Sequence, residues 1–250
     1  MNILRFLLFC LIGFAAQIID GTLGMAYGVS CRTFLKTVAG LPSALASAVV
    51  HVAEVPTTLA SGLSHWKLRN IDMSLFLPLA VPGVLGGVLG AWFLSSVGDA
   101  LEPVIDAYLI VMGFIILRKA FQKERRERHI GRAIYPLGFA GGFLDATGGG
   151  GWGPVVTSTM VAVGHDVKKT IGTVNSAEFL VTVAETTTFV VLIRDFTSYW
   201  QIILGLIVGG VCAAPLAAWI CKRLPVRPLL AVVGGLIILL NAYNLLGWLF

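Results

Sequence analysis

Two stretches of this sequence are near copies of each other: GFAAQIIDGTLGMAYG, from Gly13 to Gly28, and GFAGGFLDATGGGGWG, from Gly138 to Gly153. They lie 125 positions apart, and seven of their sixteen positions are identical, where chance would give about one. Each copy places one aspartate, Asp20 or Asp145, and a group of glycines inside an apolar run. We therefore interpret the chain as a duplicated unit.

The similarity continues downstream of both copies. HVAEVPTTLA, which begins at His51, aligns with NSAEFLVTVA, which begins at Asn175, and this alignment pairs Glu54 with Glu178. Many secondary transporters are built from a duplicated membrane segment with interrupted helices.

The composition places the chain in a membrane. Hydrophobic residues make up 57% of it and charged residues 12%, against about 45–50% and 25% in soluble proteins. The apolar runs are continuous over roughly the 20 residues that a membrane-spanning helix needs, whereas a barrel strand would alternate. The sequence predicts an all-α integral membrane protein.

The duplication divides this protein into parts of a single transmembrane domain, 1–250. We expect a first membrane repeat over residues 1–117, a basic cytoplasmic loop over 118–133, and a second membrane repeat over 134–250. The loop contains RKAFQKERRERHIGR, the most basic stretch of the chain, and basic loops stay on the cytoplasmic side.

The charges predict how the helices cross. The other basic clusters are Lys67 with Arg69, Lys168 with Lys169, and a group between Lys222 and Arg227. All of them become cytoplasmic if residues 5–38 and 134–164 each form a broken, re-entrant helical hairpin, followed by three transmembrane helices. The two repeats are then inverted. Eight simple transmembrane helices in a parallel repeat are the alternative.

The glycines predict a site. Irregular backbone at membrane depth is tolerated only where protein or a water-filled cavity satisfies it, and a helix that starts at such a break directs free N–H groups at whatever lies there. A small anion is the natural ligand. Close helix packing is the other explanation; we favour it for Gly83 to Gly90 and favour a backbone site for Gly148 to Gly151.

Four acidic residues lie within apolar runs: Asp20, Asp145, Glu54 and Glu178. Each costs about 2.5–3.5 kcal/mol at the membrane centre, so a function is expected to offset that cost. For the aspartates, capping of the following helix by accepting from N–H groups two or three residues on is the stronger interpretation. For the glutamates, proton coupling is the stronger one.

The proposed substrate-binding residues share their position beside the glycines or on the paired segments: Gly149, Gly150, Gly151, Trp152, Gly153, Thr147, Asn175, Ser176, Gly24, Tyr27 and His51. The coupling or proton residues are Glu54, Glu178, Asp20 and Asp145. The four cysteines have no metal-binding spacing, and neither a metal nor a cofactor is expected.

The phrase GFLDATGGGGWGPVV, followed by GTVNSAEF, resembles the TauE/SafE sulfite exporter family, also called the toluene sulfonate uptake permeases. Gly148 to Gly151 and Pro154 match the glycine-rich element of that family, but in the first half only Gly24 and Gly28 remain. The resemblance implies movement of sulfite, a sulfonate or a related small organic anion across the bacterial cytoplasmic membrane, with coupling to an ion gradient.

We therefore expect a multi-pass secondary transporter, with a small anion and the lipid bilayer as partners and no nucleic acid; a homo-oligomer stays open. An uncoupled anion channel or facilitator is the alternative. An enzyme is disfavoured, because the sequence has no HExxH, GxSxG or phosphate-loop motif. A membrane scaffold that recruits a partner through the basic loop is the remaining possibility.

Overall fold

The computed structural model describes residues 3–119, 121, 130–163, 165–193, 198–221 and 227–249, and every regular element in these ranges is helical. The helices are α1 (Ile3–Leu23), α2 (Tyr27–Ala39), α3 (Ser43–Lys67), α4 (Met73–Val97), α5 (Glu102–Lys119), α6 (Ile134–Gly148), α7 (Ser158–Val163), α8 (Val167–Leu192), α9 (Trp200–Ile220) and α10 (Arg227–Leu249). Short elements are the 3₁₀ turns η1 (Gly98–Leu101) and η2 (Gly131–Ala133) and the π-helix η3 (Gly153–Thr157).

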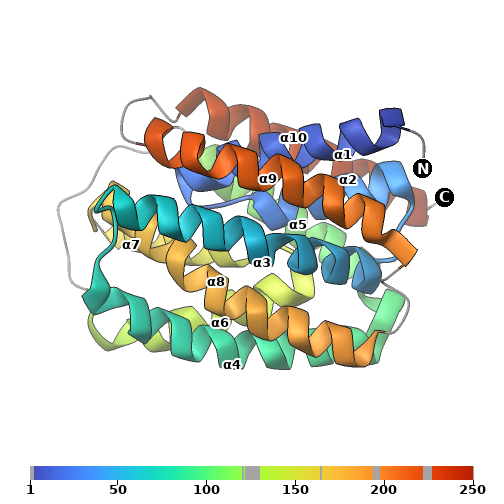
Figure 1. Cartoon of the computed structure of the whole chain (residues 1–250). Helices are drawn as coiled ribbons and strands as arrows, with labels where there is room; N and C mark the ends of the chain where they lie inside the picture. The colour runs from blue at the N-terminus through green and yellow to red at the C-terminus, as the bar shows by residue number, and fades with distance from the viewer. Residues whose placement is uncertain are drawn as a thin grey trace.

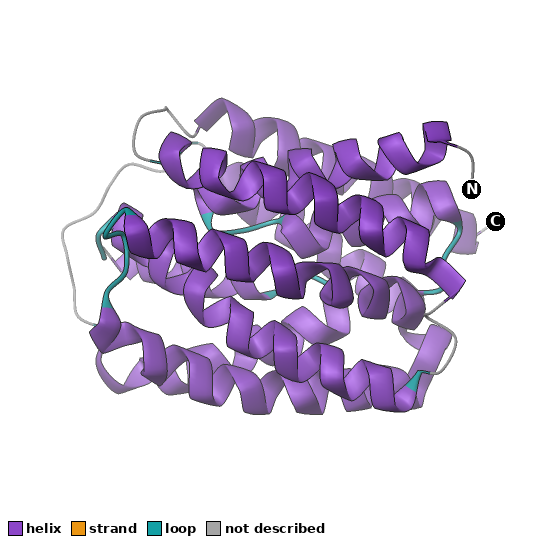
Figure 2. Ribbon diagram, in the orientation of Figure 1, coloured by secondary structure: helices purple, strands orange, loops and turns teal. Residues whose placement is uncertain are grey.

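The long helices lie side by side in one bundle, and both chain termini lie at the same end of it (Figures 1 and 2). Among the described residues, α1, α3, α4 and α9 are long and apolar enough to cross a membrane. Helix α8 carries Glu178 and Glu185 in its interior. The all-helical architecture agrees with the predicted membrane class.

Most of the predicted basic loop lies outside the described residues, as does most of the cluster between Lys222 and Arg227. Helix α5 ends at Lys119, two residues beyond the expected end of the first repeat.

The packing of the bundle is reciprocal between the two halves. Helix α1 packs on α9 and α4 packs on α6; α3 and α8 pack on each other, as do α5 and α10. The extensive contacts therefore run mainly between the first and second halves of the chain, so neither half buries its helices alone.

Glycines allow the closest of these approaches. A Cβ on Gly86 or Gly90 of α4 would collide with the backbone carbonyl of Phe139 or Phe143 on α6, and one on Gly209 of α9 would collide with the backbone of Cys10 on α1. Small residues let membrane helices approach through their backbones. The prediction that Gly83 to Gly90 serve helix packing is confirmed.

The helices are interrupted where the repeated glycines lie. Helix α1 stops at Leu23 and α2 starts at Tyr27, while α6 stops at Gly148 and the chain is helical again from Trp152. We call residues 24–29, which include the first turn of α2, the first break and residues 149–151 the second break. Met25 and Ala26 belong to a buried apolar cluster with Ala146, so the breaks lie in the core.

Candidate functional site

The two breaks contact each other directly. A Cβ on Gly28 would lie 2.6 Å from the carbonyl oxygen of Gly149, and one on Gly150 would collide with the backbone nitrogen of Val29. The carbonyl oxygen of Gly24 also accepts a 2.6 Å hydrogen bond from Thr157 Oγ1, just after the second break. Segments far apart in the sequence therefore form one buried centre.

The backbone of both breaks has left-handed conformations. Gly24 has φ = 66° and Ala26 has φ = 89° in the first break, while Gly149 has φ = 66° and Gly150 has φ = 151° in the second. Glycine adopts such angles readily and other residues rarely do. This requirement explains the glycines at the second break, whereas Ala26 in the first is a non-glycine exception.

Asp145 bridges the second break. Its backbone oxygen accepts from the N–H groups of Gly149 at 2.6 Å and Gly150 at 3.1 Å. Its Oδ1 accepts from the N–H of Trp152 at 3.1 Å. Asp20 does the same at the first break, where its carboxyl group accepts from the N–H of Tyr27.

These contacts modify the predicted capping role. The aspartates do accept from backbone N–H groups, but the donor lies seven residues on, at the start of the next helix. An ordinary N-cap residue accepts from a donor two or three residues on.

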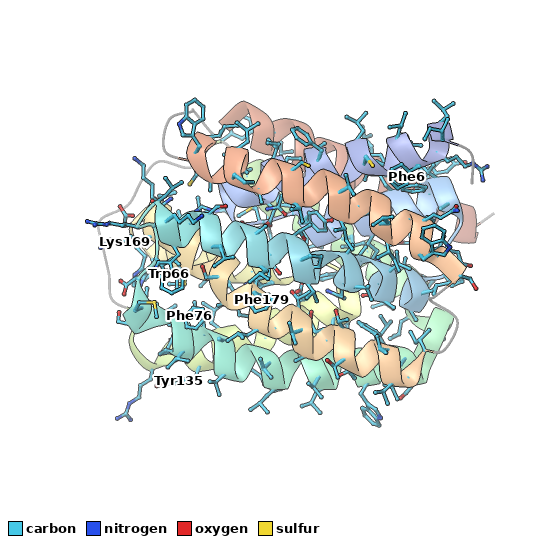
Figure 3. All side chains as sticks on the ribbon, viewed as in Figure 1. Phe6, Trp66, Phe76, Tyr135, Lys169 and Phe179 are labelled. Carbon is cyan, nitrogen blue, oxygen red and sulfur yellow. The ribbon has the colours of Figure 1, made fainter. Side chains whose placement is uncertain are left out.

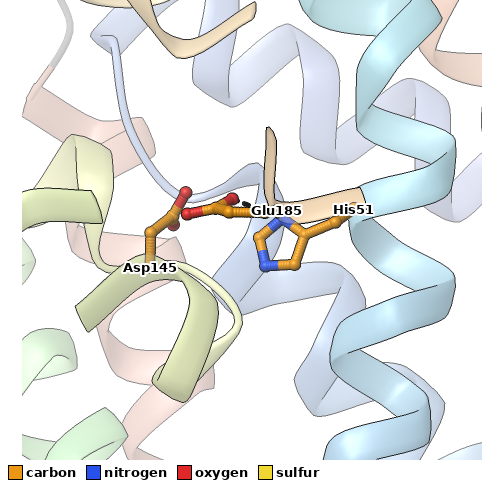
Figure 4. A group of neighbouring side chains, drawn as sticks. All are labelled: His51, Asp145 and Glu185. Carbon is orange, nitrogen blue, oxygen red and sulfur yellow. Dashed lines mark ion pairs between the residues drawn. The ribbon is translucent and has the colours of Figure 1, made fainter. Parts of the chain in front are cut away.

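His51 lies at the centre of a buried ionisable cluster. Its Nδ1 is 2.7 Å from Glu54 Oε2 and 3.2 Å from Glu185 Oε2. His51, Asp145 and Glu185 each place a side-chain N or O atom within 4.8 Å of the others (Figure 4). The imidazole stacks on Phe189 with ring centroids 5.7 Å apart, which fixes its plane.

This cluster is sealed inside the protein. His51 and Glu185 have no exposed surface, Glu54 is 1% exposed and Asp145 is 2% exposed. Burying several carboxyl groups together disfavours ionisation of all of them at once, because like charges repel strongly in a medium of low dielectric constant. The cluster is therefore suited to hold an exchangeable proton.

A neutral pair occupies the related position near the first break. Ser61 Oγ donates to Asn175 Oδ1 at 2.8 Å, and Asn175 Nδ2 lies 3.5 Å from the backbone oxygen of Asp20. The alignment of Glu54 with Glu178 pairs His51 with Asn175 and Ser61 with Glu185. One side of the α3–α8 contact therefore holds His51, Glu54 and Glu185 together. The other side holds the Ser61–Asn175 pair, with Glu178 interacting with Asp20 and with His65 Nε2 3.0 Å from Gly21 O.

Glu185, Ser61 and Arg32 were not among the site residues predicted from the sequence. Glu185 lies seven residues after Glu178, which is two helical turns and hence the same face of α8, so this spacing could have identified it. Arg32 of α2 is fully buried, and its side chain lies where a Cβ on Gly149 would be.

Several predicted lining residues have donors that already bond within the protein. Thr147 and Ser176 donate to carbonyl groups of their own helices at 2.7 Å. Trp152 Nε1 donates to Val174 O at 3.1 Å, and Tyr27 Oη lies 3.5 Å from Leu206 O. Glu178 is 5% exposed. Gly151 and Gly153 lie against Leu144 and Met25.

A cavity of about 300 Å³ opens elsewhere, between α3, α4 and α8. Trp66, Phe76 and Phe179 line it (Figure 3), and Thr58 and Ser176 contribute polar atoms. No residue of either break lines this cavity. The breaks and the ionisable cluster are thus closed to the outside in this conformation.

The fold and its centre define a class: a helical membrane protein in which two interrupted helices meet beside buried ionisable groups. Comparison with known proteins agrees. The family model described as sulfite exporter TauE/SafE matches residues 9–244. The chain is also 41% identical, over 250 aligned positions, to the protein called "Probable membrane transporter protein YtnM" of Bacillus subtilis (strain 168).

That alignment covers 97% of this chain and 83% of the Bacillus protein. The chain belongs to the TauE/SafE family, and it is a membrane transporter. The family resemblance predicted from the glycine-rich motif is confirmed.

Proposed function

We propose that this protein is a secondary transporter that moves a small anion, such as sulfite, a sulfonate or a related organic anion, across the bacterial cytoplasmic membrane and couples this movement to an ion gradient. The observation that carries the proposal is the direct meeting of the two breaks beside a buried ionisable cluster. Family membership supports transport, and the description of the family names sulfite.

The anion is proposed to bind at the second break, on the N–H groups between Gly149 and Gly153. The helical segment that starts at Trp152 directs the positive end of its dipole at this point. Arg32 adds a positive charge beside Gly149. Among the predicted side-chain contacts, Thr147 directly precedes the glycine run that contains this break and His51 lies beside Asp145.

The acidic residues Asp20, Asp145, Glu54 and Glu178 are proposed to couple transport to a proton gradient. All four are at least 95% buried, and ionisable groups inside a membrane commonly mark ion pathways and proton relays. Their electrostatic interactions reach one another across the two repeats, so a proton on one affects the others.

We also propose the inverted topology with two re-entrant hairpins. Trp66 and Lys169 lie at the end of the bundle opposite the termini (Figure 3), whereas eight simple crossings would separate the loops after α3 and α7. Lys36 disagrees with the positive-inside rule, but it forms a 2.6 Å ion pair with buried Asp106. A lysine whose charge is neutralised in this way contributes little to the orientation of the helices in the membrane.

The test is transport by purified protein in liposomes. We expect uptake of labelled sulfite or a small sulfonate that rises when a proton gradient is imposed. Flux that ignores imposed proton and sodium gradients, and persists in Glu178→Gln, would favour the uncoupled facilitator. Correctly folded protein without flux of any sulfur oxyanion, sulfonate or carboxylate would exclude the proposal.

A further inference from the structure

The carboxylate of Asp145 already occupies the position that an anion would take at the second break. Its Oδ1 accepts from Trp152 N–H at 3.1 Å, and its carboxyl group also accepts from Gly151 N–H. From Trp152 the chain is helical without interruption to Val163, so these N–H groups belong to the start of a twelve-residue helical segment. A carboxylate here gains the same stabilisation as a bound anion.

The second oxygen of this carboxyl group has no such partner. Asp145 Oδ2 is buried without a hydrogen bond, and so is Glu185 Oε1. The side chains of Asp145, Glu185 and His51 lie together, and each has a nitrogen or oxygen atom within 4.8 Å of one on the others (Figure 4). A buried acceptor without a donor is costly, and a proton taken up on one of these carboxyl groups turns a charged acceptor into a donor within the same cluster.

The titratable groups around Asp145 come from several helices, while α4, which packs on α6, carries none. His51 and Glu54 are on α3, Glu185 is on α8, Arg32 is on α2 and Tyr108 is on α5. Asp20 and Glu178 also interact electrostatically with it from α1 and α8. The carboxyl groups repel a further negative charge in this buried place, while the Arg32 guanidinium, beside Gly149, attracts one.

We infer that Asp145 is an internal competitor of the transported anion and must take up a proton before the anion can bind at the second break. The inference rests on the proposed function and specifies its coupling as symport of one proton with one anion. A protonated carboxyl group is a weaker acceptor than a carboxylate, so it releases the N–H groups of Gly151 and Trp152 to the anion.

The proton is conserved throughout the cycle. It arrives from water on one side and forms an O–H bond on Asp145, within the cluster that also holds Glu185 and His51. The anion takes the N–H groups. On the other side the proton returns to water, the anion leaves, and the carboxylate resumes its bonds to Gly151 and Trp152. No bond other than O–H forms or breaks.

We assign this competition to the second break, and not to the first, because of the side chains beside each. Asp20 has the related bond to Tyr27, but the residues related to His51 and Glu185 are Asn175 and Ser61, which bond to each other at 2.8 Å. This pair does not exchange protons near neutral pH. The first break therefore lacks the counterparts of His51 and Glu185 that adjoin the second break. The carboxyl groups that interact with Asp20 there are those of Glu54 and Glu178.

The test measures binding of labelled methanesulfonate, which stays singly charged between about pH 5 and pH 8, a range that spans the ordinary titration of carboxyl and imidazole groups. We expect wild-type affinity to rise as pH falls, by up to about tenfold per pH unit if one proton accompanies each anion. Asp145→Asn should bind methanesulfonate at every pH at least as well as the wild type at low pH.

Asp72→Asn is the matched control, because it neutralises an aspartate in the loop before α4, away from the breaks, and it should keep the wild-type pH slope. Proton uptake on binding to the wild type, measured in weak buffer, gives an independent readout that needs no variant: one proton per anion is expected. Binding without proton uptake, or an Asp145→Asn variant that keeps the full slope, would overturn the inference while leaving anion transport intact. Absence of both binding and flux for all the anions tested would instead reject the proposed function.

Discussion

Glu185 is the residue through which the ionisable cluster can be tested most selectively. Its carboxyl group lies 3.2 Å from His51 and has no exposed surface. We expect Glu185→Gln to fold normally, because an amide preserves the shape and removes a buried ionisable group. Proton-driven accumulation of anion in liposomes should fall at least about tenfold, the size expected when a stabilising proton contact of roughly 1.4 kcal/mol is lost.

Asp166→Asn is the control for this change, since it removes an acidic charge from the N-cap of the same helix and Asn also caps well. Asp166 accepts from Lys169 N at 2.8 Å at the exposed start of α8. If both variants accumulate anion equally well, Glu185 has no part in coupling.

Some residues of the buried centre could be predicted from the sequence, and others could not. Asp20, Asp145, Glu54 and His51 were predicted as site residues from the repeat, and the structure brings Asp145, Glu54 and His51 together. Glu185 was missed because comparing the repeats selects positions that are alike, and its counterpart is Ser61. Residues that differ between the repeats cannot be found by searching the repeats for similar positions.

At the scale of elements, the contact between the two breaks predicts that Gly28 tolerates no side chain. Its Cβ would lie 2.6 Å from Gly149 O and 2.9 Å from Gly150 Cα, both backbone atoms that cannot rotate away. We expect Gly28→Ala to lower the free energy of unfolding by about 1–3 kcal/mol, measured by thermal denaturation in detergent. Gly235→Ala in α10 is the control, because a Cβ there meets nothing within 4 Å. Equal stability of the two variants would contradict the close contact of the breaks.

The start of α4 gives a prediction about pH. Asp72 accepts from the Ser74 hydroxyl at 2.6 Å and from Ser74 N–H at 3.0 Å. These hydrogen bonds, the hydroxyl first, lower the pKa of Asp72 below its ordinary value of 3.8. The carboxylate therefore stabilises the fold above that value and loses its contribution as pH falls through the lowered pKa.

Asp72→Ala should cost about 1 kcal/mol near neutral pH, and the difference from the wild type should shrink in acid. Denaturation of the variant and of the wild type, measured near neutral pH and in acid, checks this prediction. A stability difference that grows in acid would contradict the stabilising role assigned to the hydrogen bonds from Ser74 to Asp72.

At the scale of the whole molecule, the proposed inverted topology can be tested by labelling from one side of the membrane. In a variant without the native cysteines, Lys67→Cys and Lys169→Cys should react with an impermeant thiol reagent from the cytoplasmic side. Ser198→Cys, before α9, should react from the outer side. Eight simple crossings predict instead that positions 67 and 169 react from opposite sides.

The all-helical fold and the positions of both interruptions could be predicted, because apolar run length and glycine content act locally. Three features could not. The direct contact between the breaks is a tertiary relation, the π-helix of Gly153–Thr157 has no distinctive sequence pattern, and the closure of the site depends on packing of all the surrounding helices. The resemblance to TauE/SafE proteins was based on GFLDATGGGGWGPVV and GTVNSAEF. The glycines and Pro154 of the first phrase lie at and just after the second break.

Whether the anion binds at the second break can be tested by locating a heavy analogue of the anion in the protein. An experimental structure of the protein with selenite, a sulfite analogue whose selenium gives an anomalous signal, should have selenium near the backbone N–H groups of Gly151 to Gly153, with an oxygen within hydrogen-bond distance of them. Selenium bound only in the cavity beside Thr58 and Ser176, or elsewhere on the protein, would contradict the claim.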